Sequence, residues 1–295
     1  MYKYRFTIFT PTYNRAYMLG NLYEGLKNQT FKDFEWLIVD DGSTDDTKEL
    51  VEKFKSENKI DINYIHKENG GKHTANNIGT ENAKGELFFV VDSDDNILEN
   101  ALEEVDKSWK LVNDKDVCVG VVGLDQYPDG RIIGKKFEKE MEIPFTDIYE
   151  KYKVVGDKAI AIKTSVMKEY KFPEDKNINF VTESVVWDDI AKKYNVRCTN
   201  NILKVTEYLE DGLTNNKLSE NYINGMAFSS LYCINKNIYT LNHYPVILLR
   251  QYINVYKFSK VSNINYAKKF NKLYKKVIYI LLKPLSYIYY KKLVK

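Results

Sequence analysis

The chain has 295 residues and a mass of 34.6 kDa, which suits one large α/β domain with an appended segment. Hydrophobic residues make up 44% and charged residues 29%, with 14 Gly and 6 Pro, so a disordered, collagen-like or low-complexity chain is excluded. The three cysteines lack a CxxC pair and indicate neither a disulfide framework nor a zinc cluster. No apolar signal-peptide region precedes the first strand-like segment, and we expect a cytoplasmic protein.

The net charge of +3 hides two regions of opposite charge. Residues 217–295 contain 14 Lys and Arg against a single acid, Glu220, and so carry +13, which leaves −10 for the rest. The same segment holds 12 of the 24 tyrosines. We therefore place a boundary near Asn216, with an α/β domain over residues 1–216 and a helical, basic and tyrosine-rich region over residues 217–295.

Short strand-like runs alternate with helix-period stretches along the first hundred residues. The predicted strands are Arg5–Thr10, Glu35–Asp40, Asp61–His66 and Glu86–Val91. The predicted helices lie around Leu19–Leu26, around Leu50–Phe54 behind the capping candidates Ser43 and Thr44, and over Thr74–Ala83. This alternation predicts an α/β fold with a Rossmann-like, mostly parallel sheet flanked by helices.

A polar loop follows each of the four predicted strands. In chain order the loops are Pro11-Thr12-Tyr13-Asn14-Arg15, Asp40-Asp41-Gly42-Ser43, Asn69-Gly70-Gly71-Lys72-His73 and Asp92-Ser93-Asp94-Asp95. Each loop alone is explained by ordinary turn or helix-cap chemistry. Because ligands bind beyond the carboxyl ends of the strands in such sheets, we expect the four loops to form one site.

The last of these loops predicts a metal site. A continuous apolar run, Leu87–Val91, is typical of a fully buried strand, and three acids follow it within four residues. Crowded carboxylates repel one another unless a divalent cation neutralises them, and their oxygens suit Mg²⁺ or Mn²⁺ completed by a substrate phosphate. The alternative is a plain strand-to-helix turn, in which one residue caps a helix that begins near Leu98.

Three of these motifs, in this order, resemble the signature of the family 2 glycosyltransferases with the GT-A fold. They are Pro11-Thr12-Tyr13-Asn14-Arg15, Val39-Asp40-Asp41-Gly42-Ser43 and Asp92-Ser93-Asp94-Asp95, and the resemblance covers about residues 4–212. It implies transfer of a sugar from a nucleotide diphosphate donor, usually a UDP-sugar, with inversion at the anomeric carbon. The implied acceptor is a hydroxyl of a saccharide or lipid-linked molecule, as in cell-surface polysaccharide or glycoconjugate synthesis.

The resemblance also implies which residues contact the nucleotide-sugar. They are Pro11, Tyr13, Arg15, Asp40, Asp41, Gly71, Lys72, Asp92, Ser93 and Asp95. Asp41 would accept a hydrogen bond from the base, with Asp40 as the second candidate. Lys72 fits a phosphate contact, because Gly70 and Gly71 let the backbone approach and the ammonium meets the anion. His73 stays open between a diphosphate contact and a plain helix-terminal residue.

The implied metal site is the DxD motif. Asp94 resembles the direct metal ligand and Asp92 the acid that meets the ribose or the metal shell. Some relatives add a His near the segment Glu207–Thr214, but this chain has no His between His73 and His243. Either Asp211 replaces that His, or the metal relies on diphosphate and water.

Transfer also needs a base that takes the proton from the acceptor hydroxyl. In the family this is an acid far downstream of DxD, and Phe180–Trp187 resembles the acceptor-site helix that carries it. Glu183, expected in the first turn of that helix behind the cap Thr182, is the predicted base. Because many members have a Glu-Asp pair where Ser184 follows Glu183 here, Asp188 stays open as the alternative.

The carboxyl-terminal region allows two interpretations. Its apolar runs, 277–282 and 285–290, are interrupted by Lys283-Pro284 and are too short to span a bilayer. Lysines between positions 268 and 276, interleaved with aromatic residues, suit a helix in the headgroup layer on the inner face of an anionic membrane. The alternative is a helical subdomain packed on the catalytic domain. No recognisable nucleic-acid module is present.

Two other classes of function stay open. A nucleotidyltransferase would also use metal-binding acids, but the first loop lacks the glycines that hold a triphosphate. A non-catalytic nucleotide-sugar-binding or scaffold protein would not need the acceptor-side acid Glu183. The sequence does not identify the donor sugar, the acceptor, the linkage or the oligomeric state.

Overall fold

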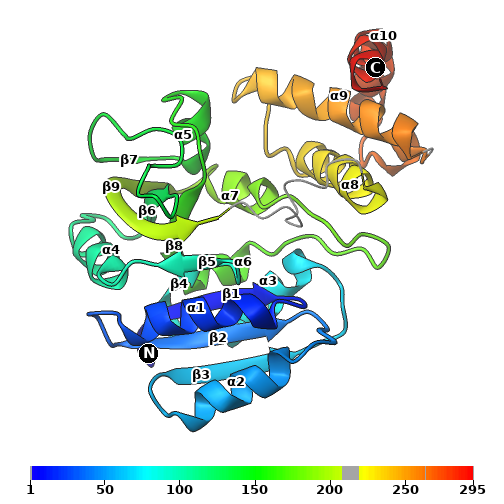
Figure 1. Ribbon diagram of the computed structural model, residues 1–295. Coiled ribbons are helices and arrows are strands. Elements are labelled where there is room, and N and C mark those ends of the chain that lie inside the picture. Colours follow the sequence, from blue (N-terminus) through cyan, green and yellow to red (C-terminus); the bar gives the residue numbers. More distant parts are fainter. Residues whose placement is uncertain (1, 208–218, 263, 295) are drawn as a thin grey trace. The chain divides into compact units, whose positions relative to one another are not determined.

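The computed structural model describes residues 2–207, 219–262 and 264–294 (Figure 1). The chain divides into two compact units. Met1–Lys171 and Ile190–Tyr208 form one, which we call the sheet unit, and Phe172–Asp189 and Leu209–Lys295 form the other, the helical unit. The boundary expected near Asn216 lies outside the described residues, and Phe172–Asp189 joins the helical unit although it precedes the last strand.

The first half of the sheet unit alternates strands and helices. Its elements are β1 (Tyr4–Thr12), α1 (Ala16–Lys27), β2 (Phe34–Asp40), α2 (Thr47–Ser56), β3 (Asp61–His66), α3 (Lys72–Asn82), β4 (Gly85–Val90), β5 (Asp95–Ile97) and α4 (Ala101–Lys110). The four predicted strands are confirmed to within two residues at each end. The three predicted helices are confirmed as α1, α2 and α3.

The second half of the sheet unit supplies shorter and less regular elements. They are β6 (Cys118–Gln126), β7 (Met141–Ile143), α5 (Phe145–Glu150), β8 (Lys158–Lys163), α6 (Thr164–Glu169) and β9 (Asn195–Thr206). The nine strands of the described residues form one sheet in the order β3-β2-β1-β4-β8-β6-β9-β5, and β7 pairs with β9. The pairs among β3, β2, β1 and β4 are parallel, whereas β8 is antiparallel to both neighbours. The fold is therefore a mixed α/β sheet flanked by helices.

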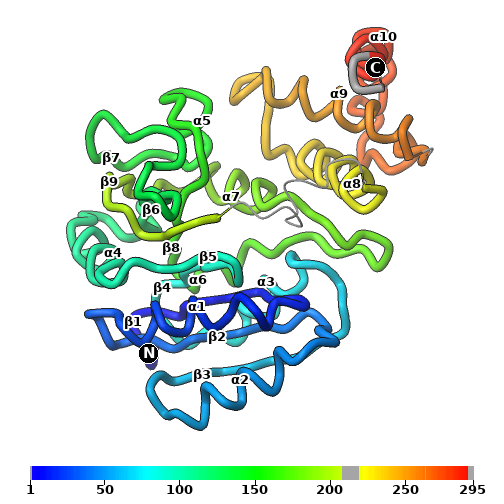
Figure 2. Tube along the Cα trace, in the orientation of Figure 1, coloured from blue at the N-terminus to red at the C-terminus, as the bar shows by residue number. Residues whose placement is uncertain are grey.

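Register brings the carboxyl ends of the parallel strands to one edge of the sheet. Thr12 at the end of β1 lies beside Asp40, and Asp40 lies beside His66 at the end of β3. Behind this edge, α1 packs an aromatic side chain, Tyr23, on Phe54 of α2 with ring centroids 4.1 Å apart. The tube in Figure 2 shows α2 beside β3. The core thus fixes the strands whose ends carry the polar loops.

Two local expectations are wrong. The residue that precedes α2 is Asp46, so neither Ser43 nor Thr44 caps this helix. The helix expected near Leu98 begins at Ala101, because the short strand β5 comes first and pairs with β9. The acidic loop is therefore a strand-to-strand connection, and the alternative of a simple strand-to-helix turn is excluded.

The helical unit consists mainly of α8 (Glu220–Lys236), α9 (Pro245–Val261), the 3₁₀ helix η1 (Tyr266–Lys269) and α10 (Leu273–Val294). α9 packs against both α8 and α10 (Figure 1). Tyr266 is buried, and Phe270 packs on Tyr279 with ring centroids 5.1 Å apart. The lysine-rich stretch from position 266 to 276 is therefore not one surface helix, because it is divided between η1 and the start of α10 and the Tyr266 and Phe270 side chains pack inward. No described helix combines the length and apolar character that crossing a bilayer requires.

Candidate functional site

Hydrogen bonds tie the loops after β1 and β2 together. The Asp41 N–H donates to the Thr12 carbonyl oxygen at 2.8 Å. The Asn14 N–H donates to Ser43 Oγ at 2.8 Å, and the Thr44 N–H donates to Asn14 Oδ1 at 2.8 Å. Asn14 has φ 51°, a left-handed conformation that asparagine tolerates better than most residues. Asn14 therefore acts as the joint between the two loops.

Asp41 holds the third loop. Its buried carboxylate accepts hydrogen bonds from the N–H groups of Gly70 at 2.9 Å and Gly71 at 2.8 Å, and from the Lys67 ammonium. The Asn69 amide nitrogen donates to the Asp41 carbonyl oxygen at 2.9 Å. Gly71 has φ 92°, which side chains rarely adopt, and it directly precedes α3. Asp41 thereby fixes where α3 begins.

Asp40 is engaged in the same way. Its buried carboxylate accepts hydrogen bonds from the Ser43 N–H at 2.8 Å and from the Tyr64 hydroxyl at 2.6 Å. Burial raises the pKa of Tyr64, and the Asp40 carboxylate raises it further. Asp40 and Asp41, the two acids predicted to meet the base, therefore also shape the polar loops.

The first loop places its predicted residues at the same edge of the sheet. Pro11 is a buried residue of β1 that pairs with Val39, and the Tyr13 side chain is 48% exposed just beyond the strand. Arg15 directly precedes α1 and donates a hydrogen bond to the Tyr17 hydroxyl. The exposed Tyr13 ring, and the Arg15 guanidinium that lies 5.7 Å from the Tyr17 ring centroid, are surfaces on which a planar base could stack.

The acidic loop after β4 is a tight turn. The Asp95 N–H donates to the Asp92 carbonyl oxygen at 3.0 Å, with Ser93 buried between them. Lys72 Nζ donates to Asp92 Oδ2 at 2.7 Å, whereas the solvent-shielded Asp92 Oδ1 has no hydrogen-bond partner among the described residues. Burial favours a higher pKa for Asp92, but the charges of Lys72 and Lys204 outweigh it and lower that pKa.

Asp94 is the least compensated acid of this loop. Its half-buried carboxylate forms no ion pair with the residues that the structure describes. Burial raises the pKa of Asp94, and the neighbouring charges of Asp92 and Asp95 raise it further. A divalent cation would relieve this repulsion, because it lies between carboxylates as a shared counter-charge.

Two buried residues that the sequence did not reveal, Lys204 and Asp125, lie beside the acids of the turn Asp92–Asp95. Lys204 on β9 lies with its Nζ 2.5 Å from Asp95 Oδ2 and 3.6 Å from Asp125 Oδ2. In the sheet register, Lys204 is opposite Ile97 of β5 and opposite Asp125 of β6. Burial raises the pKa of Asp125 to about 6. Burial lowers the pKa of Lys204, but the surrounding acids outweigh it and raise that pKa.

The chemistry of Asp92 and Asp94 fits a divalent cation held by few protein ligands. Among residues 2–207, 219–262 and 264–294, no group of three or more His, Cys, Asp or Glu side chains is arranged to hold a metal. Asp211, the alternative third ligand, lies outside the described residues. The unpartnered Asp92 Oδ1 and the crowded Asp94 leave oxygen ligands for a cation whose other positions come from diphosphate and water.

Glu183 directly precedes α7 (Ser184–Ile190), one position earlier than expected. Its carbonyl oxygen accepts hydrogen bonds from the N–H groups of Val186 at 3.0 Å and Trp187 at 3.3 Å, which places Glu183 at the helix cap. The Thr182 N–H donates to Ser229 Oγ of α8 at 3.2 Å. The segment that carries Glu183 is therefore anchored on the helical unit.

Asp188 is engaged by a different contact. Its carboxylate accepts a hydrogen bond from the hydroxyl of the buried Tyr239, which follows α8. This contact ties α7 to the rest of the helical unit. The Asp188 carboxylate thus makes a structural contact.

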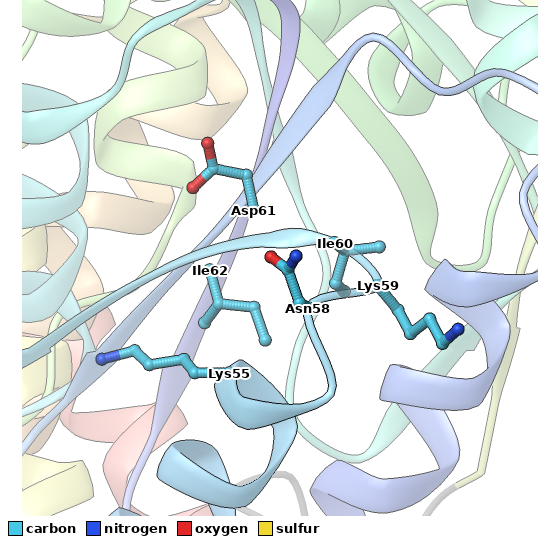
Figure 3. A pocket seen from close by; sticks show the side chains of 6 residues that line it. All are labelled: Lys55, Asn58, Lys59, Ile60, Asp61 and Ile62. Atoms are coloured by element: carbon cyan, nitrogen blue, oxygen red, sulfur yellow. The ribbon is translucent and has the colours of Figure 1, made fainter.

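A hollow of about 500 Å³ lies away from these loops, where α2 leads into β3 (Figure 3). It is lined by Lys55, Asn58, Lys59, Ile60, Asp61 and Ile62. Because β3 starts at Asp61 and ends at His66, this hollow is at the opposite edge of the sheet from the polar loops. It contains none of the predicted site residues.

Comparisons with known proteins agree with this arrangement. The model of the family described as "Glycosyl transferase family 2" matches residues 7–169, more than half of the chain. The chain belongs to the family 2 glycosyltransferases. This region contains all four polar loops, and the predicted family is therefore confirmed.

Curated relatives match only part of their own length. Glycosyltransferase GlyG of Streptococcus pneumoniae is 36% identical over 125 residues, which span 42% of this chain and 40% of that protein. The GalNAc(5)-diNAcBac-PP-undecaprenol beta-1,3-glucosyltransferase of Campylobacter jejuni is 27% identical over 198 residues, which span 64% of this chain and 60% of that protein. The chain therefore spans less than two thirds of these relatives.

Solved glycosyltransferase structures share the fold. Staphylococcus aureus TarS 1–349 in complex with UDP-GlcNAc superposes with a TM-score of 0.61 at 21% identity, covering 92% of this chain and 77% of TarS 1–349. The mannosyltransferase PcManGT of Pyrobaculum calidifontis, in complex with GDP-Man and Mn²⁺, gives a TM-score of 0.54 at 18% identity, covering 99% and 83%. The predicted GT-A fold is confirmed.

Proposed function

We propose that this protein transfers a sugar from a UDP-sugar to a hydroxyl of a saccharide or lipid-linked acceptor, with inversion at the anomeric carbon. The observation that carries the proposal is the turn Asp92–Asp95, which contains three acids, the first of which pairs with Lys72 at the start of α3. This combination suits a diphosphate that approaches with its own counter-cation. A relative solved with UDP-GlcNAc and another solved with GDP-Man and Mn²⁺ support a nucleotide-sugar donor.

The donor would lie across the four polar loops. Asp94 and Asp92 would hold Mn²⁺ or Mg²⁺, which when bound offsets the charge of the diphosphate. Lys72 would contact the diphosphate beside the N–H groups that follow Gly71. The remaining proposed donor contacts are Pro11, Tyr13, Arg15, Asp40 and Asp41 around the base, and Ser93 and Asp95 near the sugar.

We propose Glu183 as the general base. Its carboxylate would accept the proton of the acceptor hydroxyl as that oxygen attacks the anomeric carbon and the diphosphate leaves on the opposite side. Glu183 lies at the cap of α7, where its carbonyl oxygen accepts hydrogen bonds from the N–H groups of Val186 and Trp187. Asp188 is the weaker candidate, because its carboxylate is held by Tyr239.

We also propose that the protein works as a peripheral protein at the inner face of the membrane. The net charge of +13 over residues 217–295 supports attraction to anionic lipid. The Campylobacter relative has an acceptor that is linked to undecaprenol, as its name states. A lipid-linked acceptor would itself reside at such a surface.

The test of the transfer reaction uses the full chain, a panel of nucleotide sugars and Mn²⁺ or EDTA. We expect Mn²⁺-dependent release of UDP from one donor, and NMR of the transferred sugar should show the inverted anomer. Tight UDP-sugar binding without any turnover would instead identify a scaffold protein. Release of pyrophosphate from a nucleoside triphosphate would identify a nucleotidyltransferase.

A further inference from the structure

Helix α10 has two apolar faces. The inner face packs on the core of the helical unit through Tyr279, which is buried, and through Ile278 and Leu282. On the opposite side the apolar side chains are exposed. This outer stripe consists of Leu273, Val277, Ile280, Leu281, Leu285 and Ile288.

The outer stripe is continuous and long. Its members recur every three or four residues from Leu273, 77% exposed, through Leu281, 73% exposed, to Ile288, 56% exposed. This spacing keeps them on one side of a helix over about four turns. Contiguous exposed apolar surface of this kind marks an interaction site on a protein, whereas scattered single residues do not.

The charges around the stripe select the kind of partner. Lys276 and Lys283 lie along one edge of the stripe, Lys291 lies at its end, and the sequence of α10 contains no acid. A second copy that paired through this face would bring lysines toward lysines, with Glu220 as the single acid of residues 217–295. An anionic surface complements the same pattern.

We infer that the outer stripe of α10 inserts into the headgroup layer of an anionic membrane. The inference rests on the proposed membrane location and assigns it to one face of one helix. Leucine and isoleucine side chains would enter the acyl boundary, while the long lysine side chains reach the lipid phosphates. Tyr274 and Tyr287, both exposed on this helix, have the amphipathic rings that favour this depth.

The experiment measures sedimentation of the full chain with vesicles of phosphatidylglycerol and phosphatidylcholine, and with vesicles of phosphatidylcholine alone. The variant Leu281→Ser/Ile288→Ser should weaken binding to the anionic vesicles about a hundredfold, because each buried aliphatic side chain accounts for about a tenfold change. Leu111→Ser is the matched control, since Leu111 is 60% exposed in the sheet unit. It should bind like the wild type.

A second variant, Lys276→Gln/Lys283→Gln, keeps the stripe and should make binding less sensitive to salt.

Equal binding by the wild type and Leu281→Ser/Ile288→Ser would overturn the assignment to α10 and leave the membrane location standing. Absence of vesicle binding by the wild type would overturn both. A concentration-dependent dimer that Leu281→Ser/Ile288→Ser abolishes, measured by light scattering, would show that a second copy covers the stripe. UDP-sugar hydrolysis is measured for every variant as well, and it tests the proposed transferase activity independently of membrane binding.

Discussion

The sheet unit and the helical unit position their acids by different means. In the sheet unit, backbone N–H groups from Gly70 and Gly71 hold Asp41, and Lys204 holds Asp95. In the helical unit, the segment of Glu183 packs through Phe180 on Gly225 of α8, and its Thr182 N–H donates to Ser229 Oγ. Hydrogen bonds and ion pairs hold individual side-chain atoms in place, whereas packing holds the position of a whole backbone segment. We therefore expect substitutions to act locally in the first unit and by displacement in the second.

The largest expected effect comes from Asp94 in the sheet unit. Asp94→Ala should lower the transfer rate by at least about 10³-fold, because several kcal/mol of charge stabilisation are lost with the metal. The rate of UDP release with saturating donor and Mn²⁺ measures it. Asp116→Asn is the control, since the Asp116 side chain is 98% exposed. Asp94→Asn with wild-type turnover in EDTA would contradict the metal assignment.

The second prediction moves to the helical unit. Glu183→Gln should lower kcat about 10²- to 10⁴-fold, the usual loss when a general base is removed. The dissociation constant for UDP, measured by calorimetry, should change little because the proposed donor contacts lie in the sheet unit. If Asp188→Asn loses the transfer rate while Glu183→Gln keeps it, the base is Asp188.

The third prediction concerns the buried lysine. Lys204→Met removes the contact that holds Asp95, and with it the acidic turn, on β9, and this loss of positioning should weaken Mn²⁺ binding in the presence of UDP about 10- to 100-fold, although the lost positive charge alone would strengthen it. Lys158→Met is a matched control: Lys158 is also buried, but its Nζ donates to backbone carbonyls at 2.8 to 3.2 Å. Equal losses of thermal stability with unchanged Mn²⁺ affinity in both variants would assign Lys204 a purely structural role.

The smallest expected effect tests positioning by packing. A Cβ added at Gly225 of α8 would lie 2.2 Å from the Phe180 carbonyl oxygen, so Gly225→Ala should displace the Glu183 segment. We expect a several-fold lower kcat at unchanged UDP affinity, and about 1 to 3 kcal/mol less stability. Gly20→Ala is the control, because nothing lies within 4 Å of a Cβ at Gly20 of α1. An unchanged kcat in Gly225→Ala would show that the segment tolerates displacement.

The sequence predicts the parallel half of the sheet and its loops because strand length, helix period and turn residues agree there. It does not predict Lys204 as a partner of Asp95, since that contact joins residues 109 positions apart through the pairing of β5 with β9. Composition also cannot assign faces: Tyr266 and Tyr287 belong to the same basic region, yet one is buried and the other exposed. The Lys204–Asp95 contact and the choice of buried tyrosine side chains both depend on tertiary packing.

The pairing of β5 with β9 has a consequence for biosynthesis. Asp95 leaves the ribosome 109 residues before Lys204, which at typical elongation rates corresponds to about 5 to 20 s. During that interval β1 to β4 can already pair, while the acidic turn has no counter-ion from β9. A fragment that stops at the end of the family match, residue 169, lacks β9, so its acidic turn never gains Lys204 as a counter-ion. A truncation intended to isolate the donor site therefore has to retain the chain through Thr206.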